Sequence, residues 1–153
     1  MNDNQDSTQQ NSIPPVSIQA QYIKDFSLEV PHAPEIFREL TTAPKIDIQV
    51  EVNSHPLHDN FYNVSLKYAL NGDINGKKLF ILEIEYAAVV ALNNIPEEHI
   101  KPVLLVEIPR LLFPFVRSII TNAMVDGGLP PVMLNPIDFA AMLQNSEKNN
   151  KKE

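Results

Sequence analysis

The sequence contains no cysteine, and only four of its 153 residues are glycine. A chain without cysteine can form no disulfide, no thiol nucleophile and no thiolate-ligated zinc site. The glycines stand at positions 72, 76, 127 and 128, whereas a loop that wraps phosphate groups needs a dense glycine cluster followed by a helix. The sequence therefore excludes cysteine-dependent chemistry and phosphate-binding loops of that kind.

Positive charge is also scarce. The chain has 12 lysines and arginines against 19 acidic residues, which gives a net charge of −7. Nucleic acids and anionic membrane surfaces are bound by basic surfaces, so neither is an expected partner. Residues 1–17 lack a basic segment followed by an apolar run, so no signal peptide is expected. The sequence predicts a soluble cytoplasmic protein.

The most apolar stretch, residues 103–125, does not have the composition of a membrane span. Glu107, Arg110 and Arg117 interrupt it, together with two prolines. Each charge at bilayer depth costs roughly 2.5–3.5 kcal/mol even on a lenient scale. We expect a helix that is buried or lies in an interface, and no insertion into a membrane.

Four segments of the chain alternate apolar and polar residues with a period of two, at residues 18–30, 46–52, 62–70 and 80–86. This pattern predicts an antiparallel sheet with one exposed face. In the first segment Ala20 and Tyr22 fall on the apolar side, and the alternation breaks near Ile23 and Lys24, which suggests a β-bulge or a twist. Residues 71–76 hold two Asn-Gly pairs and predict a hairpin between the last two strands. Residues 31–44 are long enough for a crossover loop between the first two.

Beyond residue 102 the apolar period changes to three and four residues, at Leu112, Phe115, Val116, Ile119, Ile120, Ala123 and Met124. This spacing predicts a long helix that ends at Gly127-Gly128. Its apolar stripe is too wide for one sheet to cover, so we expect its other side to meet another subunit. A short second helix should be capped by Asn135, with Pro136 at its first position, and should run through residues 139–143.

Together these elements predict an α+β fold: a four-stranded antiparallel sheet packed with one long and one short C-terminal helix. The folded domain should span residues 18–144. Residues 1–17 and 145–153 are polar and bury almost nothing, so both tails should be disordered.

No catalytic or metal site is evident in the sequence. His55 and His58 have a spacing that could hold a metal, but beyond Asp59 no third ligand is fixed, so we interpret them as loop histidines. The chain has no G-x-S-x-G nucleophile motif. We expect no enzymatic activity, no cofactor and no metal.

Two features could serve binding. The first is a set of acidic residues on the polar side of the predicted strands: Asp25, Glu29, Asp47, Glu51, Glu83 and Glu85. Leu79 and Ile81 lie among them, so this side is either a solvated face or a partner surface. The loops 30–37 and 129–134 are rich in apolar residues and either roof the core or line a groove whose floor or wall is the short helix. Met142 suits such a groove, because methionine adapts to varied apolar partners.

Three sequence segments resemble the SecB family of bacterial export chaperones. They are YIKDFSLE at 22–29 followed by PHAP at 31–34, LFPFVR at 112–117 with GLPP at 128–131, and LNPIDF at 134–139. Their order and spacing extend the resemblance over roughly residues 18–144. Many members carry glycine after the fourth strand, where this chain has Ala87-Ala88.

The resemblance implies a dimer of dimers, a homotetramer with the long helices packed between dimers through Phe115, Ile119, Ile120 and Ala123. It implies an ATP-independent chaperone that holds unfolded precursor proteins and delivers them to the SecA motor ATPase. The SecA-binding residues would be Asp25, Glu29, Ile81 and Glu83. The groove for client proteins would be lined by Val30, Pro31, Ile36, Phe37, Val132, Leu134, Phe139, Met142 and Leu143. Two alternatives remain: a SecB-like chaperone dedicated to an antitoxin, and a small-molecule-binding domain that uses the same groove.

Overall fold

A computed structural model describes residues 12–152, which form one sheet and a layer of helices. The strands are β1 (Val16–Glu29), β2 (Lys45–Pro56), β3 (Phe61–Ile74) and β4 (Lys77–Leu92). A 3₁₀ turn, η1 (Glu35–Glu39), lies between β1 and β2. The helices are α1 (Glu97–Pro102), the π-helical η2 (Val103–Glu107), α2 (Ile108–Asp126) and α3 (Phe139–Asn150). The predicted α+β class, with one long and one short C-terminal helix, is confirmed.

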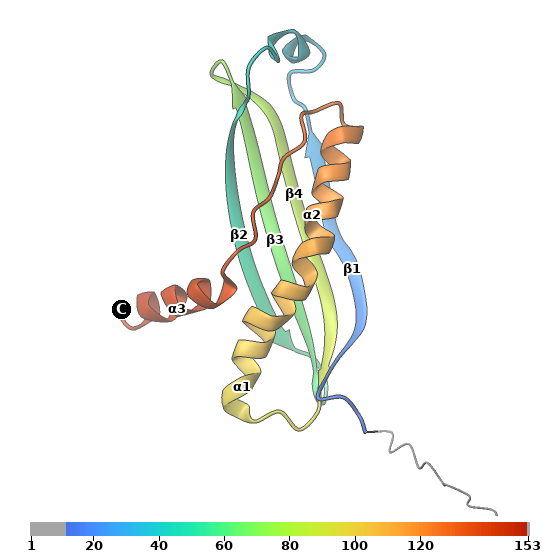
Figure 1. Cartoon of the computed structure of the whole chain (residues 1–153), viewed down its shortest axis with the longest axis vertical. Coiled ribbons are helices and arrows are strands. Elements are labelled where there is room, and N and C mark those ends of the chain that lie inside the picture. The colour runs from blue at the N-terminus through green and yellow to red at the C-terminus, as the bar shows by residue number, and fades with distance from the viewer. Residues whose placement is uncertain (1–11, 153) are drawn as a thin grey trace, which may run out of the picture.

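The strands form one antiparallel sheet in the order β1-β4-β3-β2. Two hairpins make β2, β3 and β4 neighbours, whereas β1 pairs with β4. The chain must therefore pass from one edge of the sheet to the other between β1 and β2, as predicted. Residues 30–44, which we call the crossover loop, make this passage at one end of the sheet, and η1 forms part of it (Figure 1).

Two register shifts in β1 decide which way its side chains point. One lies between Ile23 and Asp25, so the break in alternation predicted there is confirmed as a register shift. The other lies between Ile18 and Ala20 and was not predicted. Each extra residue reverses the alternation that follows it. Tyr22 consequently pairs with Ala87 on the face turned away from the helices, and the prediction that Ala20 and Tyr22 lie on the buried side is wrong.

The β3–β4 hairpin is longer and tighter than predicted. Its turn consists of Asn75 and Gly76 alone, with φ angles of 50° and 76° that asparagine and glycine tolerate. Gly72 lies within β3 under the ring of Phe80, where a Cβ atom would collide. A register shift after Gly72 leaves Leu79 fully buried. The prediction that Leu79 lies among the exposed acidic residues is therefore wrong.

The segments α1, η2 and α2 follow one another without a break from Glu97 to Asp126 and lie across one face of the sheet (Figure 1). The sequence did not predict α1 or the π turn. Pro102 and Pro109 flank that turn, and each removes a backbone N–H donor, so the regular helical bonding is interrupted there. The core between the layers comes from β3, β4 and α2, and includes Val64, Leu66, Leu70, Leu82, Ile84, Leu112, Val116, Ile120 and Met124.

The C-terminal helix begins later and ends later than predicted. Asp138, not Asn135, caps α3: its carboxylate accepts a hydrogen bond from the Ala141 N–H at 3.0 Å. Residues 145–150, expected to be disordered, are helical, because a polar segment can continue a helix whose first turn is anchored by packing. At the other end, residues 16 and 17 belong to β1. Residues 1–11 lie outside the described part of the chain.

Candidate functional site

The sheet face turned away from α2, which we call the open face, carries the acidic residues in adjacent rows. Glu29 on β1 lies opposite Ile81 on β4, and Asp25 lies opposite Glu85. The same rows continue across β3 to β2, where they end at Asp47 and Glu51. The four residues that the resemblance assigned to SecA binding, Asp25, Glu29, Ile81 and Glu83, therefore share one surface although two strands separate β1 from β4 in sequence.

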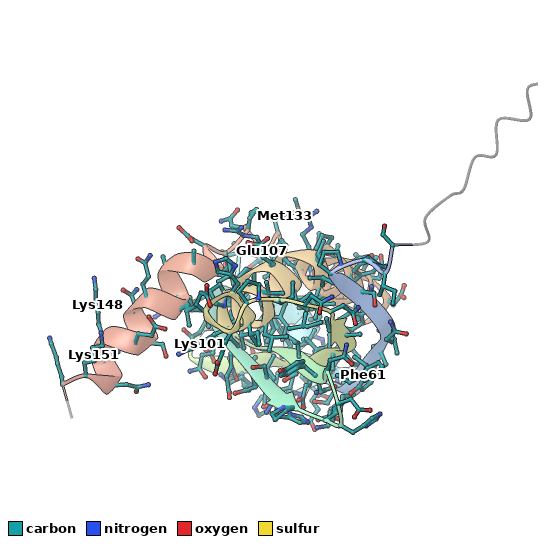
Figure 2. All side chains as sticks on the ribbon, turned by 90° about the horizontal axis from the view of Figure 1, so that it is seen from below. Phe61, Lys101, Glu107, Met133, Lys148 and Lys151 are labelled. Atoms are coloured by element: carbon teal, nitrogen blue, oxygen red, sulfur yellow. The ribbon has the colours of Figure 1, made fainter. Side chains whose placement is uncertain are left out.

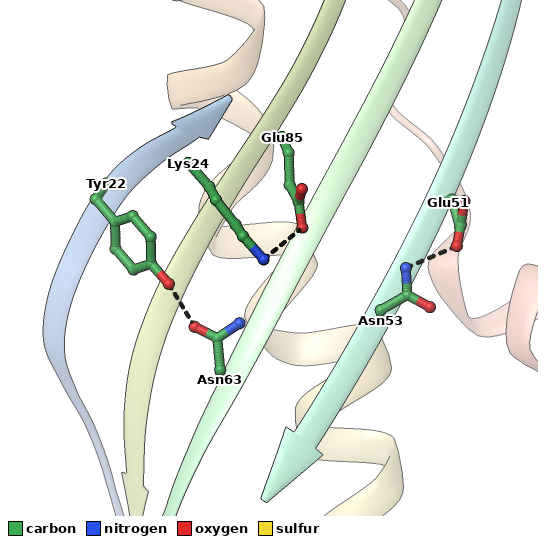
Figure 3. A network of polar contacts seen from close by, with 6 residues as sticks. All are labelled: Tyr22, Lys24, Glu51, Asn53, Asn63 and Glu85. Carbon is green, nitrogen blue, oxygen red and sulfur yellow. Dashed lines mark hydrogen bonds and ion pairs between the residues drawn. The ribbon is translucent and has the colours of Figure 1, made fainter. Parts of the chain in front are cut away.

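The acidic part of the open face is hollowed and only partly neutralised. A shallow concavity of about 430 Å³ is lined by Asp25, Glu51, Lys67, Glu83 and Glu85, among others. Six carboxylates lie in these rows against two lysines, a net charge of −4. One of the lysines is Lys24, which lies at the register shift between Ile23 and Asp25. Its Nζ lies 3.8 Å from the Glu85 carboxylate (Figure 3). Such a surface favours a positively charged partner.

The other half of the open face is uncharged, and a long-range hydrogen bond stiffens it. The Tyr22 hydroxyl donates to the Asn63 side-chain oxygen at 2.7 Å and so ties β1 across β4 to β3 (Figure 3). Around this bond lie small residues such as Ser65 and Ala87, both buried. The charge is therefore confined to the half of the face that leads into the crossover loop.

Seven of the nine predicted groove residues fall into two groups at different ends of the molecule, and the other two, Val132 and Leu134, lie between them in sequence. Val30, Pro31, Ile36 and Phe37 lie in the crossover loop, whereas Phe139, Met142 and Leu143 lie on α3 (Figure 1). A linker, residues 127–138, runs between the two ends along the helix-covered face (Figure 1). Four of the nine predicted residues are buried within the subunit and anchor these segments instead of lining an open surface: Ile36, Val132, Leu134 and Phe139.

An apolar stripe on the edge strand β2 connects these two groups. It consists of Ile46, Ile48, Val50 and Val52, which share the helix-side face and are half-buried or exposed. Near α3 the stripe ends at a small hollow of about 80 Å³ lined by Val52, Leu105, Phe139, Met142, Leu143 and Ser146. The groove prediction missed this stripe, although its alternating β-branched residues were visible in the sequence.

The linker and α3 leave further apolar and basic side chains outside. Met133 is 82% exposed and points away from the body (Figure 2). The later part of α3 extends away from the sheet with Lys148 and Lys151 along it (Figure 2). One ion pair, 3.1 Å between Lys101 Nζ and the Glu147 carboxylate, links α3 to α1.

The outer side of α2 is apolar, as predicted for a subunit contact. Leu111, Phe115 and Val125 are about half exposed, and Ile119 and Ala123 are partly exposed. Ile120, by contrast, is fully buried against the sheet. Its assignment to the subunit interface is wrong, because Ile120 lies on the same side of the helix as Val116 and Met124, which face the core.

This apolar surface continues from α2 onto β1. The Phe115 ring stacks on Tyr86 with their centroids 6.1 Å apart. Desolvation raises the pKa of Tyr86, whose hydroxyl donates to the Gln21 side chain at 3.2 Å. Ile23 and Phe26 lie on the helix side of β1, opposite Tyr86 and Ile84, and both are exposed. The edge of β1 and the outer side of α2 thus form one continuous apolar surface.

Within residues 12–152, His55 and His58 are not part of a group of side chains that could hold a metal ion. No group of three His, Asp or Glu side chains in this range could hold a metal ion. His55 and His58 are both exposed, and the His58 ring packs on Phe61 with centroids 5.3 Å apart. None of the helices in that range is long and apolar enough to cross a membrane.

Comparison with known proteins agrees with this architecture. Residues 9–150 match the family model described as preprotein translocase subunit SecB. The protein-export protein SecB of Rhodospirillum rubrum is 51% identical over 131 residues, which cover 86% of this chain and 81% of that protein. The SecB of Xanthobacter autotrophicus is 46% identical over 135 residues, 88% of this chain and 86% of that protein.

Among solved structures, the fold is similar to a SecB-like chaperone of Mycobacterium tuberculosis, Rv1957, in complex with a ChAD peptide from the HigA1 antitoxin. The TM-score is 0.67, with 16% sequence identity over 80% of this chain and 91% of that one. At this identity the comparison establishes the shared fold alone.

Proposed function

The chain belongs to the SecB family, and from this premise we propose that it is an ATP-independent chaperone that holds unfolded precursor proteins for export and delivers them to the SecA ATPase. It works in the cytoplasm, where precursors are made, and it needs no cofactor. Holding a chain and releasing it by competition involves no bond-making step, so we expect no enzymatic activity.

The observation that carries this proposal is the apolar surface that folding leaves uncovered. An unfolded client exposes apolar side chains and unpaired backbone groups together. The stripe on β2 can receive alternate apolar side chains, and within residues 12–152 β2 is an edge strand that pairs on one side alone. Val30, Pro31 and Phe37 continue this surface at the crossover end, and Met142 and Leu143 continue it at α3. A folded protein offers no such segments, so binding depends on the state of the client and not on its sequence.

We propose that four subunits assemble as a dimer of dimers through the α2–β1 apolar surface, with Phe115, Ile119 and Ala123 in the contact. A single short segment binds weakly, because ordering it costs chain entropy. Several grooves on one assembly raise the effective concentration of the next segment to the order of millimolar. Assembly therefore converts weak local contacts into stable holding of a long chain.

We further propose that SecA binds the acidic half of the open face through Asp25, Glu29, Ile81 and Glu83. The two functions then occupy opposite faces of the same sheet. A client can remain in the groove on the helix side while SecA binds to the carboxylates on the other side. Delivery follows from this separation, because SecA need not displace the client in order to bind.

A binding experiment tests the central part of the proposal. The probe is reduced and carboxymethylated α-lactalbumin, which cannot refold because its disulfides cannot re-form, and native α-lactalbumin is the control. Fluorescence anisotropy should show saturable binding of the unfolded form only, unchanged by ATP. Equal binding of both forms, or binding of neither, would overturn the proposal.

A further inference from the structure

The crossover loop is fastened to the tip of the β3–β4 hairpin. Glu39, the last residue of η1, accepts a hydrogen bond from Lys77 Nζ at 2.6 Å and another from the Asn75 side-chain amide at 3.3 Å. Lys77 and, more weakly, Asn75 hold the pKa of the Glu39 carboxyl below its ordinary value. The hairpin tip can present these two donors because its turn is tight, with Asn75 and Gly76 both at positive φ. We call this set of three residues the Glu39 clamp.

The loop also has a second attachment, on the helix side. Ile36 is 1% exposed and anchors η1 in the core. The next residue, Phe37, lies against Gly128, the second residue of the linker. Two atoms of its ring lie 3.8 and 3.9 Å from the position that a Cβ atom of residue 128 would take, which is van der Waals distance. Two backbone hydrogen bonds, from Ile36 N–H to His32 and from Phe37 N–H to Pro34, keep the turn compact. The loop thus bridges the hairpin tip and the start of the linker.

From this geometry we propose that Glu39 is a positioning residue for client binding: through Lys77 and Asn75 it fixes the crossover loop so that Phe37 is held at the crossover end of the groove. The inference rests on the proposed chaperone function. Phe37 is 39% exposed, so its ring is available to a client while its Gly128 side remains packed. Glu39 itself lies on the hairpin side of the loop and acts through the loop's position.

The size of the effect follows from the kind of contact. The Glu39 and Lys77 side chains are 28% and 54% exposed, and exposed ion pairs contribute modestly. Without the clamp the loop would sample more conformations, and a client would have to order it on binding. We expect client binding to weaken by about two- to fivefold, the range that one exposed ion pair supports.

The test uses the full-length protein and three variants. Glu39→Ala removes the clamp. Glu35→Ala is the matched control, because Glu35 is an acidic residue of the same turn that is not part of the Glu39 clamp. The double variant Glu39→Lys/Lys77→Glu restores the pair with its charges exchanged. Hydrogen exchange at the Ile36 and Phe37 amides reports the loop, anisotropy with reduced and carboxymethylated α-lactalbumin reports client affinity, and circular dichroism checks the fold.

Glu39→Ala should speed exchange at both amides and weaken client binding about two- to fivefold. Glu35→Ala should do neither. The exchanged pair should bring both values back to those of the unmodified protein. Faster exchange with unchanged client affinity would overturn the positioning role. Unchanged exchange in Glu39→Ala would overturn the clamp itself. If the unmodified protein bound no unfolded probe, the chaperone proposal would fail, and the exchange measurement would still decide whether the clamp exists.

Discussion

Replacing Phe115 by alanine should weaken assembly of the subunits while leaving each subunit folded. The side chain is 49% exposed on the outer side of α2. A phenylalanine side chain can bury about 200 Å², so about 100 Å² remains to be covered by a neighbouring subunit. At about 25 cal/mol per Å², this area is worth about 2.5 kcal/mol in each copy. Because alanine retains a small part of the contact, we expect a loss of about 2 kcal/mol per copy, which lowers the association constant roughly 30-fold for each copy whose Phe115 lies in the contact.

Sedimentation velocity over a dilution series measures this change directly. Phe115→Ala should dissociate at higher concentrations than the unmodified protein, and its circular dichroism should remain that of a folded subunit. Ser118→Ala, at an exposed polar position of the same helix, is the matched control and should assemble normally. Ile120→Ala should instead lower the free energy of unfolding by about 2–5 kcal/mol, because it opens a cavity in the core. A Phe115→Ala protein that stays fully assembled at every dilution would refute the proposed role of this surface.

Three further changes test other parts of the structure. Glu83→Lys changes the acidic half of the open face by two charges and should weaken SecA binding at least about tenfold in calorimetric titration, with client binding unchanged; full SecA affinity would contradict the assignment. Tyr68→Phe should leave unfolding free energy unchanged or raise it by about 1–2 kcal/mol, because the buried hydroxyl has no partner among the described side chains and backbone groups. Burial raises the pKa of Tyr68, so the unmodified protein should lose stability relative to Tyr68→Phe as the pH rises above about 10. Denaturant titrations at about pH 7 and above about pH 10 measure both effects. A clearly lower unfolding free energy of Tyr68→Phe at about pH 7 would contradict the first statement, and an unchanged difference between the two proteins above about pH 10 would contradict the second. Gly72→Ala should lower the unfolding free energy by about 1–3 kcal/mol through collision with Phe80, and an unchanged melting temperature would show that the ring can move aside.

The sheet could be predicted because its signal is local. Alternation with a period of two runs along β2 and over most of β3 and β4, and β1 keeps it between its register shifts. The crossover was implied by the length of residues 31–44. The pairing of β1 with β4 then brings Glu29 opposite Ile81. The acidic surface forms because alternate residues of neighbouring strands point to the same side of the sheet. Whether SecA binds there remains a prediction.

The errors arose where packing or an extra residue overrides the local pattern. The register shift after Ile18 turns Tyr22 outward, and nothing in the alternation of Ile18, Ala20 and Tyr22 signals it. On α2 the apolar stripe is so wide that spacing alone cannot separate Ile120, which is fully buried, from Phe115, which is half exposed. Asn135 is as good a helix cap as Asp138 in isolation, and the packing of Phe139 in the core decides between them.

A molar-mass measurement by light scattering during gel filtration, with and without reduced and carboxymethylated α-lactalbumin, tests most directly whether this chain assembles in order to hold unfolded polypeptide. We predict four copies alone, and a heavier species that contains all four copies together with the probe when it is added. A monomer that elutes separately from the unfolded probe would contradict both the assembly and its purpose.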